Sequence, residues 1–192
     1  MRHVRVVMGL GNPGREFEGT RHNLGAVAVK MAAEKRGLKM IPSLRSHSLL
    51  AEEQDISNLI AFALPQTFMN DSGRALTGLA KRYKLKSLED LVVVHDELDL
   101  PPGVVKVKRG GGVAGHRGLT SIVASANSSD FVRVRIGIGR PTGGHQVRDY
   151  VLERLKPSER DSLNVALEVA SDAVNLILDK GVDIAMNEIN GN

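Results

Sequence analysis

Residues 91–97 read LVVVHDE, a continuous apolar run that ends in three polar side chains. Such a run is typical of a central strand in a parallel sheet, buried on both faces. In open α/β sheets, ligands bind beyond the carboxyl ends of the strands. The stretch therefore predicts the class of fold, and it predicts the sheet edge at which Asp96 and its neighbours would do chemistry.

The flanking segments predict a single α/β domain over residues 1–192, with a twisted mixed β-sheet flanked by helices. Apolar runs and alternating patterns predict further strands, at residues 3–10, 48–52, 59–64, 104–108 and 131–139. Apolar residues at helical spacing predict helices, from Leu24 towards Gly37, over 75–83, over 119–126 and from Ser158 onward. Neither an internal repeat nor a low-complexity linker interrupts this order.

The composition excludes several classes of function. The chain has no cysteine, which excludes disulfides, Cys-ligated zinc and thiol catalysis. No stretch approaches the ~20 apolar residues that a membrane span needs. The apolar run near the N-terminus is too short for a signal peptide. These features predict a cytoplasmic protein that does not enter a membrane.

Charge is distributed unevenly along the chain. Between residues 101 and 148, eight Lys and Arg residues accompany one acid, Asp130, whereas residues 157–192 hold seven acids and two basic residues. A cationic region of this kind attracts polyanions, with nucleic acid the first candidate. A solvated basic face without a partner is an equally good interpretation of the charge alone.

The stretch GLGNPGREFEGTRHN (9–23) contains the glycines of a dinucleotide-binding loop, G-x-G-x-x-G. That loop must lead directly into a helix, whose N-terminus holds the pyrophosphate. Here charged residues and Gly19 follow Gly14, and helical periodicity begins only at Leu24. The run GGGVAG (110–115) lacks the Lys-Ser/Thr pair of a P-loop. An NAD-dependent oxidoreductase is therefore disfavoured.

A different chemistry fits the polar residues of this loop. Asn12 and His22 follow the first strand, and Asp96 could orient one ring nitrogen of His22 while the other accepts a proton. With no Cys and no Ser in a G-x-S-x-G elbow, water is the expected nucleophile. The side-chain amides of Asn12 and Asn70 could hold that water or an acyl oxygen.

Structural roles compete with this interpretation. A histidine beside a Gly-rich loop can simply cap or pack, and Asn12-Pro13-Gly14 is an ordinary turn sequence. A metal site is disfavoured, because no two of the six histidines have the H-E-x-x-H spacing and cysteine is absent.

Six motifs occur in order along nearly the whole chain. They are G-L-G-N-P-G (9–14), T-R-H-N (20–23), Q-T-F-M-N-x-S-G (66–73), H-D-E-L-D-L-P-P-G (95–103), K-x-K-x-G-G-G-x-x-G-H (106–116) and R-x-R-I-G-I-G-R-P (133–141). Together they resemble the bacterial peptidyl-tRNA hydrolase family.

The resemblance implies a monomeric α/β esterase without metal or cofactor. Its substrate would be peptidyl-tRNA, cleaved at the ester between the peptide and the 3′-terminal ribose, which recycles the tRNA. His22 would be the catalytic base, Asp96 its orienting carboxylate, and Asn12 a positioning group for the water. The resemblance also implies substrate contacts at Asn70, Met69, Phe17 and His116, and a basic pair for the 5′-phosphate of the tRNA at Lys108 and Arg135.

Two positions depart from the family pattern. Phe17 stands where the family usually has Tyr, and Arg117 stands where it usually has Asn. Arg117 could add a phosphate contact at the tRNA 3′ end or could narrow the cleft; from the sequence, Arg117→Asn is expected to hydrolyse equally fast or faster. The competing function is a non-hydrolytic RNA-binding relative of the same fold. The presence of His22, Asp96 and Asn12 favours the enzyme.

Overall fold

The run LVVVHDE forms strand β5 (Leu91–Glu97), and all seven of its residues are buried. It lies between two parallel neighbours, β1 and β7, in a computed structural model that describes residues 3–191. The prediction of a buried central strand is confirmed. Its last three residues, His95, Asp96 and Glu97, stand at the carboxyl edge of the parallel part of the sheet.

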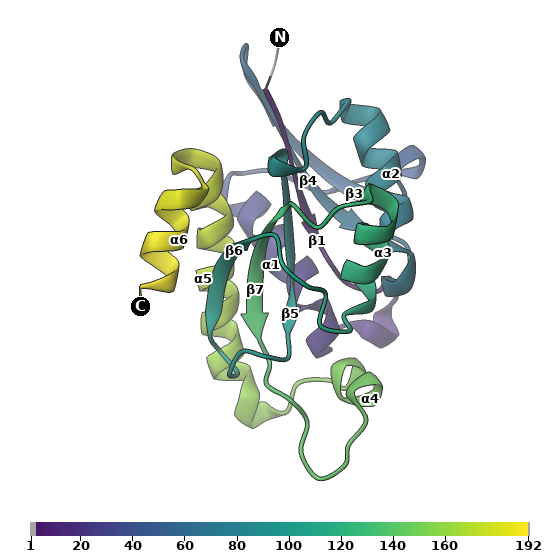
Figure 1. Ribbon diagram of the computed structural model, residues 1–192, viewed down its shortest axis with the longest axis vertical. Helices are drawn as coiled ribbons and strands as arrows, with labels where there is room; N and C mark the ends of the chain where they lie inside the picture. The colour runs from purple at the N-terminus through teal and green to yellow at the C-terminus, as the bar shows by residue number, and fades with distance from the viewer. Residues whose placement is uncertain (1–2, 192) are drawn as a thin grey trace.

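Within residues 3–191, seven strands form one mixed sheet in the order β2-β3-β4-β1-β5-β7-β6 (Figure 1). The four central strands β4, β1, β5 and β7 are parallel, whereas β2, β3 and β6 pair antiparallel at the two ends. The remaining strands are β1 (His3–Gly9), β2 (Ile41–Ser43), β3 (Ser48–Gln54), β4 (Asn58–Pro65), β6 (Val105–Arg109) and β7 (Val132–Gly137). This architecture confirms the predicted single α/β domain with a mixed sheet.

Helices cover both faces of the sheet (Figure 1). On one face, Val92 and Val94 of β5 join the core beneath α1, α5 and α6. On the other face, Leu91 and Val93 join the core beneath α2 and α3. The helices are α1 (Leu24–Lys35), α2 (Ser72–Tyr83), α3 (Arg117–Ala126), α4 (Val147–Leu152), α5 (Pro157–Lys180) and α6 (Val182–Asn190). None of them is both long and apolar enough to cross a membrane, within the residues that the structure describes.

The glycines at the start of the chain bring α1 against the sheet. A Cβ on Gly25 would lie 2.2 Å from the carbonyl oxygen of Val94, and one on Gly9 would lie 2.6 Å from the carbonyl oxygen of Gly25. Residues 10–23 separate β1 from α1 and contain two short 3₁₀ turns, Arg15–Phe17 and Arg21–Asn23. The glycines thus allow close backbone packing, and α1 begins at Leu24, as its apolar periodicity predicted.

Among the strands and α-helices of residues 3–191, β2 and α4 are the two that the sequence patterns did not predict. Strand β2 is an exposed three-residue edge strand containing Pro42, and α4 has only six residues, too few for a periodic pattern. The predicted C-terminal helix is divided into α5 and α6 at Gly181, which has a φ of 92°.

Candidate active site

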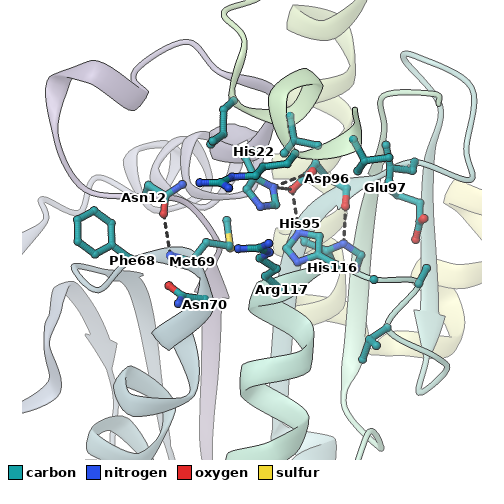
Figure 2. A pocket seen from close by; sticks show the side chains of 18 of the residues that line it. Asn12, His22, Phe68, Met69, Asn70, His95, Asp96, Glu97, His116 and Arg117 are labelled. Atoms are coloured by element: carbon teal, nitrogen blue, oxygen red, sulfur yellow. Dashed lines mark hydrogen bonds and ion pairs between the residues drawn. The ribbon is translucent and has the colours of Figure 1, made fainter. Parts of the chain in front are cut away.

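A cleft with a volume of about 520 Å³ opens beyond the carboxyl ends of β1 and β5. The two strands are parallel neighbours, so the loop after β1 and the polar end of β5 meet there. Loops before α2 and α3 and the short helix α4 complete its walls. Its lining includes Asn12, Phe17, His22, Phe68, Met69, Asn70, His95, Asp96, Glu97, His116, Arg117, Val147, Arg148, Val151 and Leu152 (Figure 2).

The Asp96 carboxylate lies between two imidazole rings. Nδ1 of His22 is 2.9 and 3.0 Å from its two oxygens, and Nε2 of His116 is 2.9 Å from Oδ1 (Figure 2). Asp96 is 2 % exposed. Burial alone would raise the pKa of this carboxyl, but its interactions with His22 and His116 outweigh burial and hold the pKa well below its usual range. Asp96 is therefore a buried, ionised partner for both rings.

The hydrogen bonds define which ring nitrogens are free. Nδ1 of His116 accepts a hydrogen bond from the backbone N–H of Leu119 at 3.3 Å, so its Nε2–H donates to Asp96. His22 uses Nδ1–H for Asp96, and its Nε2 has no protein partner within residues 3–191. Of the two imidazoles on the carboxylate, His22 is the one with a nitrogen available to the cleft. A direct substrate contact through a ring nitrogen of His116 would require breaking one of these bonds.

A third histidine lies beneath the cleft. Nδ1 of His95 donates to the backbone carbonyl of Asp96 at 2.7 Å, and its buried Nε2 has no partner in the described part of the chain. Burial, reinforced by His116, lowers the pKa of His95 to about 3. His95 is thus neutral at physiological pH and adds no positive charge beside the His22–Asp96 pair.

Asn12 is held rigidly with its amide toward the cleft. Its Oδ1 accepts the backbone N–H of Met69 at 2.7 Å, and its Nδ2 has no hydrogen-bond acceptor among residues 3–191 (Figure 2). The side chain of Asn23 fixes the backbone of Asn12 through two bonds, Asn12 N–H to Oδ1 at 2.8 Å and Nδ2–H to the Asn12 carbonyl at 2.9 Å. The sequence reasoning gave Asn23 no role, although Asn23 closes the T-R-H-N motif.

The rim of the cleft is apolar on one side. The rings of Phe17 and Phe68 meet edge to face with centroids 6.3 Å apart, and Phe68 is 59 % exposed. Met69 is buried, whereas Asn70 is exposed and lines the cleft beside it. The four residues expected from the sequence to contact substrate, Phe17, Met69, Asn70 and His116, therefore line one cavity with His22.

A buried arginine next to His22 anchors the turn that carries this histidine, and the sequence patterns did not single it out. Arg21 is 2 % exposed and donates to both oxygens of Glu159 at 2.6 and 2.8 Å and to the carbonyl of Tyr150 at 3.0 Å. Its guanidinium also lies 4.1 Å from the centroid of the Tyr150 ring. Arg21 thereby joins the His22 turn to α4 and to the start of α5, which is a contact that no local pattern encodes.

The basic residues of β6 and β7 lie beside the cleft, in different environments. Lys106 pairs with Arg135 and Lys108 with Arg133 in the antiparallel register, so the four side chains share one face of the sheet. Lys108 is exposed. Nε of Arg135 is 3.1 Å from Oε2 of Glu97, which lines the cleft. Arg133 is buried, and it donates to the carbonyls of the 111–112 turn.

His22, Asp96 and His116 also have the composition of a metal-binding group. Their ligand atoms lie within 4.8 Å of one another. In the arrangement described above, however, ring N–H groups occupy the space between these atoms, and a metal ion would have to displace both protons.

Comparison with known proteins agrees with the fold and the cleft. The profile of the family described as peptidyl-tRNA hydrolase matches residues 6–192. The peptidyl-tRNA hydrolase of Actinobacillus pleuropneumoniae is 40 % identical to the chain, and the match covers 99 % of this chain and 98 % of that protein. The peptidyl-tRNA hydrolase of Nocardia farcinica is 42 % identical, and the match covers 96 % of this chain and 95 % of that protein. A crystal structure of peptidyl-tRNA hydrolase from Acinetobacter baumannii is 36 % identical and superposes with a TM-score of 0.89, covering 97 % of this chain and 94 % of that one. The chain belongs to the peptidyl-tRNA hydrolase family.

Proposed function

We propose that His22 activates a water molecule in this cleft to hydrolyse the ester between the peptide and the 3′-terminal ribose of tRNA. Hydrolysis of peptidyl-tRNA is the activity of the family to which the chain belongs. The proposal assigns that activity to residues. Its central observation is the buried contact from Nδ1 of His22 to the Asp96 carboxylate, which leaves Nε2 free toward the cleft.

In the proposed reaction, Nε2 of His22 takes a proton from water as the water oxygen attacks the ester carbonyl. A tetrahedral oxyanion forms, and the bond between the carbonyl carbon and the ribose oxygen then breaks. The imidazolium returns its proton to the departing ribose oxygen, so the ring ends neutral. Asp96 stabilises the imidazolium, and the second bond from His116 helps to keep this carboxylate ionised.

The amide of Asn12 is the proposed donor to the attacking water or the developing oxyanion. Because Oδ1 is engaged by Met69, its Nδ2 donors are already oriented toward the cleft before substrate binds. Preorganised donors of this kind lower a barrier by typically ~3 kcal/mol. Asn70 and Met69 are proposed to hold the peptide near the ester, and Phe17 with Phe68 to contact it from the apolar rim.

Lys108 and Arg135 are the proposed contacts for the 5′-phosphate of the tRNA. They share one face of the β6–β7 pair beside the cleft, and phosphate contacts are independent of base sequence. An enzyme that accepts many different tRNAs must recognise backbone and ends rather than bases.

We further propose that the enzyme acts in the cytoplasm as a monomer, without metal or cofactor. The protons between Asp96 and the two rings support metal-free hydrolysis. Exhaustive dialysis against a chelator should leave the rate of hydrolysis unchanged, and light scattering should give a mass near 20.7 kDa. A rate that falls on chelation and returns with added zinc would refute the metal-free mechanism.

Replacement of His22 by Ala tests the proposed base. Release of free tRNA from N-acetyl-alanyl-tRNA should slow by at least about a hundredfold, because the water loses its proton acceptor. Affinity for the tRNA, measured by filter binding, should stay near that of the wild type. Full turnover in the variant would remove His22 from this role. Binding without any hydrolysis by the wild type would favour an RNA-binding protein of the same fold.

A further inference from the structure

Arg117 lies on the border between two hollows. It lines the cleft with His22, and together with Asn70 it also lines a shallow groove along α3 that contains Thr120, Ser121 and Ser125. The side chain is exposed and makes no hydrogen bond or ion pair with any residue in the range 3–191. Figure 2 shows it rising from the start of α3 between Asn70 and His116. Arg117 is therefore available to a ligand that enters the cleft from the α3 side.

Neighbouring arginines are committed to contacts within the protein. Arg133 donates to the carbonyls of Gly111 and Gly112, and Arg135 pairs with Glu97. A guanidinium presents several N–H donors in a planar fork that matches a phosphate group. Among the residues that the structure describes, Arg117 alone of these three has all its donors free, so it has the chemistry of an unoccupied phosphate contact.

The two sides of the cleft suit different parts of the substrate. The α4 side carries Val147, Val151 and Leu152, which suit peptide side chains. The α3 side carries Arg117 and a groove lined by hydroxyl groups. The loop of residues 110–116 connects the strand that bears Lys108 directly to Arg117. A strand of RNA that reaches the cleft from the basic face would pass this side.

We propose that Arg117 binds a phosphodiester of the last, single-stranded nucleotides at the tRNA 3′ end as they lie in the groove along α3. This inference rests on the proposed function, since the leaving group of the reaction is the ribose of the final nucleotide. The contact makes Arg117 a specificity-determining residue for RNA esters. It also reverses the expectation from the sequence: Arg117→Asn hydrolyses peptidyl-tRNA more slowly than the wild type.

The test pairs a protein variant with a substrate variant. N-acetyl-alanyl-tRNA is prepared with a neutral methylphosphonate at each of the 3′-terminal linkages in turn, and kcat/KM is measured for the wild type and Arg117→Gln. On the natural substrate, loss of a charge-assisted contact lowers kcat/KM about tenfold in Arg117→Gln. At the linkage that Arg117 contacts, methylphosphonate lowers kcat/KM of the wild type by a similar factor. The same substitution leaves kcat/KM of Arg117→Gln unchanged, because that variant has already lost the contact. Arg117→Lys keeps the charge without the fork and loses less than Arg117→Gln.

Arg148→Gln is the matched control. Arg148 is also exposed and lines the cleft, but it extends from α4 on the opposite side. The decrease in kcat/KM caused by Arg148→Gln and the decrease caused by methylphosphonate should therefore be independent, so that the two factors multiply at every linkage. The same multiplication for Arg117→Gln, or unchanged kcat/KM in that variant, overturns the proposal. Hydrolysis retained in His22→Ala would refute the proposed base and would leave the coupling between Arg117 and RNA intact, so the two failures are distinguishable.

Discussion

The imidazole cluster around Asp96 and the basic face of β6 and β7 use charge in opposite ways. In the cluster, burial and hydrogen bonds of 2.9 to 3.0 Å hold the carboxylate between both rings. On the basic face, the side chain of Lys108 is exposed to solvent. Buried charges interact strongly and are screened little, whereas exposed charges are weakened by salt. If the proposed function holds, we expect the cluster to control the rate of hydrolysis and the exposed cations to control the affinity for tRNA.

The largest loss is expected from Asp96→Asn. Removing the carboxylate leaves the His22 imidazolium without its partner, and comparable carboxylate-to-amide changes lower kcat about 10⁴-fold. His116→Asn removes one bond to Asp96 and leaves the His22 contact, so its effect should be far smaller. Single-turnover release of tRNA measures both. Equal losses would mean that the two imidazoles act as one unit, and the division of roles between them would be wrong.

The next largest loss is expected from Asn12→Ala. Removal of a preorganised donor should lower kcat by about a hundredfold, with little change in KM. Asn23→Ala is the companion variant, because it frees the Asn12 backbone without removing the amide, and it should lose less. A change confined to KM would place Asn12 in substrate binding rather than in stabilisation of the reacting atoms.

Stability at acidic pH should report on His95, the buried histidine beside the cluster. Because burial lowers the pKa of His95 from 6.5 to about 3, the unfolded chain binds a proton in this interval that the folded protein does not. Above pH 6.5 the His95 ring is neutral in both states, so it does not change the free energy of unfolding. Below pH 6.5 that free energy falls on acidification, by at most about 1.4 kcal/mol per pH unit. Urea unfolding of the wild type and His95→Gln from pH 7 to pH 4 measures the difference. Parallel pH dependences would show that His95 does not contribute.

The smallest effects are expected on the basic face, and they should be unequal. Lys108→Ala should flatten the slope of log affinity against log salt by about 0.7 to 0.9, the value for one phosphate contact. Arg135→Ala should flatten it less, because Glu97 already neutralises part of the Arg135 charge. Glu97→Gln should therefore strengthen tRNA binding. Equal slopes for the two alanine variants would show that the ion pair opens when tRNA binds.

Features that depend on residues close together in the sequence could be predicted, whereas contacts between segments far apart in the sequence mostly could not. The buried strand β5 and the start of α1 at Leu24 could be predicted from the sequence, because side-chain periodicity is a local property. The juxtaposition of His22 and Asp96 was also predictable, since parallel strand ends share one edge of the sheet. Pairing of Arg135 with Glu97 was not, because it depends on the register of two strands that are distant in sequence.

By itself, the sequence determined the sheet-forming runs, the order of the elements, the family and the identity of the residues at the strand ends. Tertiary structure alone decided that His116 shares Asp96 with His22, that Arg21 joins the His22 turn to α4 and α5, and that Arg117 has no side-chain partner within residues 3–191. Hydrogen bonds depend on distances and directions at the scale of tenths of an ångström. Those are fixed only when segments from opposite ends of the chain pack together.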